Sequence, residues 1–260
     1  MTSPASQNLP IIRLVDVRKS YQMGSLTSHV VQGISLDIQA GEYVCIMGPS
    51  GCGKSTLLNL LGCLDQPTSG DYFLGGKNVA HLNDDDLSEV RCRNLGFIFQ
   101  SYNLIQQLSV LENIAVPLYY RGASDKEMRQ KAERLAEQVG LSHRLNHKPN
   151  ELSGGQQQRV AIARALVNDP LVILADEATG NLDSKSGQEI LGIFDELNSQ
   201  GKTLVFVTHD ERMVQRCKRI VRLEDGLVAH DMPGGAALSE KQKVESGKQK
   251  QDLQVPSPVH

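Results

Sequence analysis

The chain lacks the features that would assign it to a membrane, to a secretory route or to nucleic acid. No apolar run approaches the roughly 20 residues that a membrane-spanning helix needs. The first ten residues, MTSPASQNLP, have neither a basic start nor an apolar core, so we expect no signal peptide there. The formal net charge is only -3, too little to draw the whole chain to nucleic acid or to an anionic membrane surface.

The cysteines do not have the spacing of a disulfide framework or of a metal site. The five, at positions 45, 52, 63, 92 and 217, form no C-x-x-C pair and are odd in number. A reducing cytosolic compartment is the simplest interpretation of this pattern.

The composition is that of a soluble globular protein, with 40% hydrophobic and 22% charged residues. Strand-like and helix-like segments alternate, which predicts an α/β architecture with a largely parallel central sheet. We expect strands at residues 11–17, 34–38, 43–47, 95–99, 171–175 and 203–208, and a final hairpin that turns at Asp225-Gly226. We expect helices at residues 54–64, 83–93, 125–140, 155–168 and 184–199.

The polar ends of the chain differ from its middle. Residues 1–10 are expected to form a loose tail. Residues 233–260 are rich in Gly, Lys, Gln and Pro, so they cannot bury a core and are expected to be disordered. Between about 101 and 165 no strong strand pattern occurs, which predicts a helical insertion.

Residues 48–56 read GPSGCGKST and match G-x-x-x-x-G-K-[ST], the phosphate-binding loop, between a predicted strand and a predicted helix. The glycines let the backbone curl so that its N–H groups face anionic oxygens, and the helix adds its positive dipole end. Lys54 is expected to reach the β and γ phosphates, and Ser55 to offer its hydroxyl to Mg²⁺. A glycine-rich turn that binds nothing is the alternative. The expected nucleotide contacts here are Gly48, Pro49, Ser50, Gly51, Cys52, Gly53, Lys54, Ser55 and Thr56.

The segment LVILADE, residues 171–177, predicts a buried strand that ends in two carboxylates. In an open α/β sheet, ligands bind at the carboxyl ends of the strands. Asp176 is therefore expected to hold Mg²⁺ and its water shell beside Ser55, while Glu177 points elsewhere and accepts a proton from an attacking water. The alternative is a pair of solvated acids at a strand end.

A second helix start follows from ELSGGQQQRVAIARAL, residues 151–166. Ser153, Gly154 and Gly155 precede an apolar helical face, so a hydroxyl and bare backbone amides could form a second anion site. An ordinary capped helix start is the alternative. Two other clusters are interpreted as structural: residues 83–86, NDDD, as a helix cap, and His143 with His147 as a surface pair.

Taken together, these motifs resemble one family, the ATP-binding cassette ATPases. LSGGQ at 152–156 matches that family's signature sequence, and GPSGCGKST and LVILADE accompany it in the family's order and rough spacing. The resemblance covers residues from about 11 to 230. It implies that residues 11–232 form a nucleotide-binding domain with a P-loop NTPase core, an N-terminal antiparallel β subdomain and the helical subdomain at about 101–165.

The resemblance also implies roles for residues that have ordinary explanations when taken singly. Gln100 matches the Q-loop glutamine, which contacts the metal and the attacking water and senses the membrane partner. Residues 181–183 match the D-loop, which runs along the dimer seam. His209 matches the switch histidine that touches the γ-phosphate, and Tyr21 the aromatic residue that stacks on adenine. Ala178 departs from the family, which usually has proline there; since proline only stiffens that turn, we expect activity to survive.

By this resemblance, two copies of the chain form a head-to-tail dimer that sandwiches two Mg·ATP. Ser153, Gly154 and Gly155 of one copy contact the nucleotide held by the other copy, and Gln156 and Asp183 are further expected nucleotide contacts. The catalytic residues are expected to be Lys54, Gln100, Glu177 and His209. The metal contacts are expected to be Ser55, Gln100 and Asp176.

The sequence of residues 97–122 and 60–79 resembles the branch of the family that serves macrolide exporters and lipoprotein-releasing systems. This implies an ATPase that is peripheral on the cytoplasmic face of the membrane and powers a separate permease, whose coupling helix docks just after Gln100. A regulatory ATPase that drives a membrane protein controlling cell-wall hydrolases remains an alternative. A soluble cassette working on DNA or ribosomes is a weaker one, because the chain has one cassette, no sustained heptads and little net charge.

Overall fold

The structure is a computed structural model, and it describes residues 9–235 of the chain. The predicted tails at 1–10 and 233–260 lie mostly outside the described residues. Strand β10 ends at Pro233, which is the first residue of the predicted C-terminal tail. No helix in the described range is long and apolar enough to cross a membrane.

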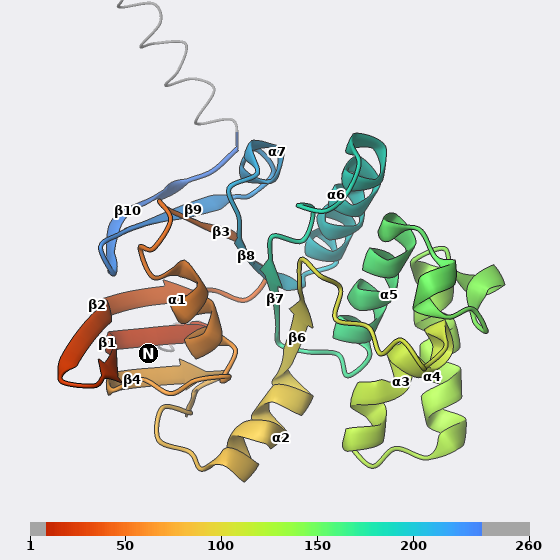
Figure 1. The fold of residues 1–260 in the computed structure, drawn as a ribbon, viewed down its shortest axis with the longest axis horizontal. Helices are drawn as coiled ribbons and strands as arrows, with labels where there is room; N and C mark the ends of the chain where they lie inside the picture. Colours follow the sequence, from red (N-terminus) through yellow and green to blue (C-terminus); the bar gives the residue numbers. More distant parts are fainter. Residues whose placement is uncertain (1–8, 236–260) are drawn as a thin grey trace, which may run out of the picture.

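A six-stranded sheet forms the centre of the molecule, in the order β10-β9-β3-β8-β7-β6 (Figure 1). All neighbouring strands are parallel except β9 and β10, which confirms the predicted largely parallel sheet. The β9–β10 hairpin turns at Asp225 and Gly226, as predicted, and both residues have positive φ, 47° and 76°. The strands are β3 (Tyr43–Met47), β6 (Leu95–Ile98), β7 (Val172–Asp176), β8 (Thr203–Val207), β9 (Arg219–Glu224) and β10 (Leu227–Pro233).

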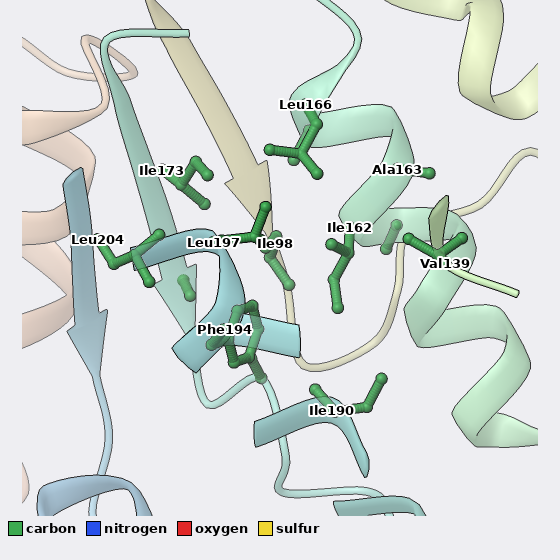
Figure 2. Packing of buried hydrophobic residues seen from close by; sticks show 14 of the residues in the cluster. Ile98, Val139, Ile162, Ala163, Leu166, Ile173, Ile190, Phe194, Leu197 and Leu204 are labelled. Atoms are coloured by element: carbon green, nitrogen blue, oxygen red, sulfur yellow. The ribbon is translucent and has the colours of Figure 1, made fainter. Parts of the chain in front are cut away.

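The central strands are buried on both faces, so successive side chains enter two separate cores. On β3, Tyr43 and Cys45 join one core while Val44 and Ile46 join the other. Helices α5 (Gly154–Leu166) and α6 (Ser184–Ser199) contribute to the first core, and α1 (Lys54–Leu61) to the second. Figure 2 shows Phe194 of α6 and Ile162 of α5 among the side chains of the first core. Helices α1 and α5 therefore cover opposite faces of the sheet.

An antiparallel sheet packs against α1, as the resemblance implied. Its order is β2-β1-β4-β5, from β1 (Ile12–Met23), β2 (Leu26–Ile38), β4 (Ser69–Leu74) and β5 (Lys77–Asn78). Strands β1 and β2 are longer than predicted because their far ends pair with each other while their side chains stay largely exposed. An exposed hairpin gives no apolar alternation from which a strand could be predicted.

The predicted helical insertion is present, and it contains a helix that the sequence analysis missed. Its helices are α3 (Val110–Tyr120), α4 (Asp125–Gln138), two short 3₁₀ turns (Ser142–Arg144 and Pro149–Glu151) and α5. Helix α3 begins with a capping box between Ser109 and Glu112 and continues past Pro117, whose presence disguised it. The remaining helices are α2 (Asp84–Asn94) and α7 (Glu211–Val214).

The interpretation of residues 83–86 as a helix cap is confirmed; of the predicted surface pair, His143 is exposed and His147 is half-buried. Asn83 caps α2 by accepting a hydrogen bond from the Asp86 N–H at 2.9 Å. His147 contacts Arg144 rather than His143, with 2.8 Å between ring and guanidinium nitrogens. Within residues 9–235, no three His, Cys, Asp or Glu side chains gather in a way that could hold a metal ion.

Candidate functional site

The carboxyl ends of four neighbouring parallel strands bring the predicted residues to one edge of the sheet. In the order β3-β8-β7-β6, these ends lead into the 48–56 loop, His209, Asp176 with Glu177, and Gln100 (Figure 1). Parallel strands place their carboxyl ends on the same side, so residues far apart in sequence meet there. This edge is the candidate site.

The 48–56 loop requires glycine at two points for steric reasons. A Cβ on Gly48 would lie 2.2 Å from the Leu223 carbonyl oxygen and 2.7 Å from Cys52 Sγ. Gly53 has φ of 99°, and a Cβ there would lie 2.8 Å from the Val30 carbonyl oxygen. Gly53 also precedes α1 without any side-chain cap, so the first N–H groups of α1 remain available to an anion.

Lys54 lies over this loop. Its Nζ donates hydrogen bonds to the carbonyl oxygens of Gly48 at 2.8 Å and Pro49 at 2.7 Å. Its positive charge also acts on Asp176, partly offsetting the rise in the pKa of that carboxyl. The ammonium therefore sits between the loop and the end of β7, where it would meet a phosphate bound in the loop.

The two consecutive carboxylates diverge. Asp176 is half-buried at the end of β7; burial first, and the Glu177 charge second, raise its pKa. Glu177 has a left-handed backbone, with φ of 43°, and its Oε1 lies 2.7 Å from Nδ1 of His209. Sequence reasoning selected both Glu177 and His209 but did not foresee that they contact each other directly.

Gln100 and Asn181 join the end of β6 to the loop that follows β7. The Asn181 side-chain amide donates to the Gln100 carbonyl oxygen at 3.0 Å, and Gln100 Nε2 donates to Asn181 Oδ1 at 3.4 Å. The predicted Q-loop and D-loop segments are therefore in contact. Asp183, two residues on, caps α6 by accepting from the N–H groups of Lys185 and Ser186, both at 3.0 Å.

Tyr21 lies on β1 close to the start of α1. Its hydroxyl donates to Asp65 at 2.7 Å, and Lys19 Nζ lies 5.0 Å from the ring centroid. Burial, followed by the Asp65 hydrogen bond, raises its pKa, whereas a hydrogen bond with Thr56 lowers it. The contact with Thr56 puts the Tyr21 hydroxyl beside the 48–56 loop.

The residues of LSGGQ form a capped helix start on the other face of the sheet. Ser153 and Gln156 make a reciprocal capping box at the N-terminus of α5, with distances of 3.3 and 3.0 Å. A Cβ on Gly154 would lie 2.9 Å from the Tyr102 hydroxyl, and one on Gly155 would lie 3.0 Å from Ser186 Oγ. Since α5 and α1 cover opposite faces of the sheet, one chain presents the loop and LSGGQ from different layers.

Sequence reasoning missed one polar group beside the site, Asp210. Its carboxylate accepts from Arg212 Nη2 at 2.7 Å and from the Thr179 hydroxyl at 2.9 Å, and so ties the segment after β8 to the loop after β7. The hydrogen bond from Arg212 is the first cause that lowers the Asp210 pKa to about 2. No local pattern marks this residue, because its partner Thr179 is 31 residues away.

The comparisons with known proteins agree with this arrangement. Residues 31–180 match a family model described as "ABC transporter". An uncharacterized ABC transporter ATP-binding protein of Thermotoga maritima is 54% identical over 218 residues, 84% of this chain and 93% of its own. The macrolide export ATP-binding/permease protein MacB of Bdellovibrio bacteriovorus is 51% identical over 221 residues, 85% of this chain but only 34% of its own. A solved ATP-binding cassette, dimeric and bound to ADP and Pi, superposes with a TM-score of 0.78 at 46% identity, covering 85% of this chain and 98% of its own.

We predict that Asp210→Asn lowers the free energy of unfolding at pH 7 by about 1 to 2 kcal/mol. The folded pKa of about 2 lies below the ordinary 3.8, so the carboxylate stabilises the fold above 3.8 and loses that contribution as the pH falls toward 2. Urea unfolding of both proteins should show a constant difference between about pH 5 and 7 that narrows between about pH 4 and 2.

Asp85→Asn, at an exposed position in the first turn of α2, is the control, and it should change stability by no more than about 0.5 kcal/mol. Equal stability of Asp210→Asn and the parent at pH 7, or a difference that widens in acid, would contradict the assigned role of Asp210.

Proposed function

Since the chain belongs to the ABC transporter family and hydrolyses ATP, we propose that it is the nucleotide-binding subunit of an export or mechanotransmission system of the macrolide or lipoprotein type. In this proposal it powers a separate membrane permease and works as a peripheral protein on the cytoplasmic face. The observation that carries the ATPase part is the convergence of Lys54, Gln100, Asp176, Glu177 and His209 at the ends of four parallel strands.

Hydrolysis in this site depends on positioning and on charge. Lys54 and the N–H groups at the start of α1 bind the phosphates. Glu177 accepts the proton of the attacking water, and its contact with His209 at 2.7 Å fixes the direction of the carboxylate. His209, whose side chain is 78% exposed, would contact the γ-phosphate from the open side of the site through its second ring nitrogen, Nε2.

The residues at this edge fit Mg²⁺. Ser55, Gln100 and Asp176 offer a hydroxyl, an amide oxygen and a carboxylate, the hard oxygen donors that this ion prefers. Burial raises the pKa of Asp176, and a nearby cation would offset the cost of keeping that carboxylate charged. Mg²⁺, when bound, neutralises charge on the phosphates. These three residues would hold it.

The active form is a homodimer in which each nucleotide is bound between two copies. The LSGGQ segment and the 48–56 loop lie on opposite faces of the sheet, so residues 153–156 can complete the site of a second copy. ATP favours the closed dimer because it contacts both copies, and hydrolysis removes the contact across the seam.

The permease is expected to dock in a groove of about 790 Å³ on the flank of the molecule. The groove lies between α2, β6, α3 and the end of α5, next to the segment that follows Gln100. Phe97, Pro117 and Tyr120 give it an apolar lining, and four arginines against one carboxylate, Glu89, give it a positive edge. Such a groove suits a short helix with an acidic end, supplied by the membrane partner.

We predict that Glu177→Gln hydrolyses ATP about 10² to 10⁴ times more slowly while its affinity for ATP is kept. Slow hydrolysis preserves the sandwiched ATP, so the variant should form a stable dimer with Mg·ATP. Single-turnover hydrolysis and light scattering during size-exclusion chromatography measure the two effects. Glu196→Gln, an exposed change on α6, should behave as the parent protein. An equally fast Glu177→Gln enzyme would remove Glu177 from the proposed mechanism.

We also predict that Glu177→Gln protein with Mg·ATP retains a membrane protein with a large extracytoplasmic domain from detergent-solubilised membranes of its own cell. Adding Arg93→Glu should abolish retention by reversing charge in the groove. Arg129→Glu is the matched control, since Arg93 and Arg129 are both exposed and each pairs with a glutamate four residues earlier or later on its helix. Recovery of ribosomes or DNA without a membrane protein would contradict the permease proposal and leave the ATPase intact.

A further inference from the structure

Gln158 is a fully buried polar side chain whose position in α5 is not explained by packing alone. It is 0% exposed, and its Nε2 donates a hydrogen bond of 2.8 Å to the carbonyl oxygen of Ala178. Its Oε1 is also buried and has no hydrogen-bond partner. Leaving a buried amide oxygen unpaired typically costs about 1 to 3 kcal/mol, so this side chain is retained despite a penalty that an apolar residue would avoid.

The carbonyl that Gln158 holds belongs to the residue directly after Glu177. Glu177 has the left-handed backbone described above, and the turn closes with a hydrogen bond of 2.9 Å from the Gly180 N–H to the Glu177 carbonyl oxygen. The Glu177 N–H is bonded to the Val207 carbonyl oxygen, also at 2.9 Å. A left-handed conformation is unfavourable for a glutamate and persists only where neighbouring bonds hold it.

Bonds from separate elements hold this turn on different sides. Asp210 holds Thr179, Asn181 is tied to Gln100, and Gln158 holds Ala178, which is itself 4% exposed. Of these, only Gln158 comes from α5.

We propose that Gln158 is a positioning residue for ATP hydrolysis: it holds the Ala178 carbonyl so that the Glu177 carboxylate keeps its direction. This inference rests on the proposed role of Glu177 as the group that accepts the proton of the attacking water.

The test is Gln158→Met, which keeps the length of the side chain and removes the donor. The turnover number for ATP should fall about 10- to 100-fold while KM for ATP changes by less than about twofold, since a displaced catalytic group affects the reaction more than binding. Asn198→Leu is the matched control. Asn198 is 6% exposed and also donates to a backbone carbonyl, that of Gly41 at 2.8 Å, at the far end of the strands. It should lower the melting temperature and keep the turnover number.

A double variant separates positioning from general stability. In a Glu177→Gln background, Gln158→Met should slow the residual hydrolysis no further, because the group that it positions is already gone. If the double variant hydrolyses ATP more slowly than Glu177→Gln by the same factor that Gln158→Met shows alone, the proposal is overturned. A normal turnover number in Gln158→Met beside a slow Glu177→Gln would also overturn it, and in that case the role of Glu177 stands.

Gln158→Asn, whose amide is one methylene too short to reach Ala178, is the second variant. If Gln158→Met folds poorly, Gln158→Asn should fold and show the same loss of turnover with KM unchanged. Failure of both variants to fold would assign Gln158 to core stability and overturn the proposal. Fast hydrolysis by Glu177→Gln alone would remove both the proposed base and the residue that positions it.

Discussion

The parallel pairing of β3, β8, β7 and β6 is the constraint on which the rest of this molecule depends. Because these four strands run in one direction, their carboxyl ends emerge at one edge. Residues as far apart in the sequence as Gly48 and His209 therefore meet there. Parallel strands must be buried on both faces, which requires α1 on one side and α5 with α6 on the other. The same constraint separates the 48–56 loop from LSGGQ within one chain, which is why the proposed site takes its LSGGQ from a second copy.

At that edge, short polar contacts fix the positions of the functional side chains relative to one another. The Glu177–His209 contact, the Asp210–Thr179 bond and the Gln100–Asn181 pair each join the ends of two different strands. These contacts link the segments that follow β6, β7 and β8 to one another.

The sequence predicted most of this site because its chemistry depends on local patterns. A glycine-rich loop between strand and helix, and two acids after a buried strand, can be recognised in a short stretch of sequence. The missed elements depend on features that a short stretch does not show. Helix α3 was hidden by Pro117, the outer ends of β1 and β2 lack apolar alternation, and β4 carries little periodicity. Asp210 and Gln158 acquire their roles only through partners that the fold brings to them.

The most direct test of the account is hydrolysis by a mixture of two inactive variants, Lys54→Ala and Gly154→Asp. If LSGGQ acts on the nucleotide of a second copy, each mixed dimer contains one site with an intact loop and an intact LSGGQ. An equal mixture should then regain about a quarter of the parent activity, from half of the dimers with one working site each. No activity in the mixture, with mixed dimers shown to form, would contradict the account.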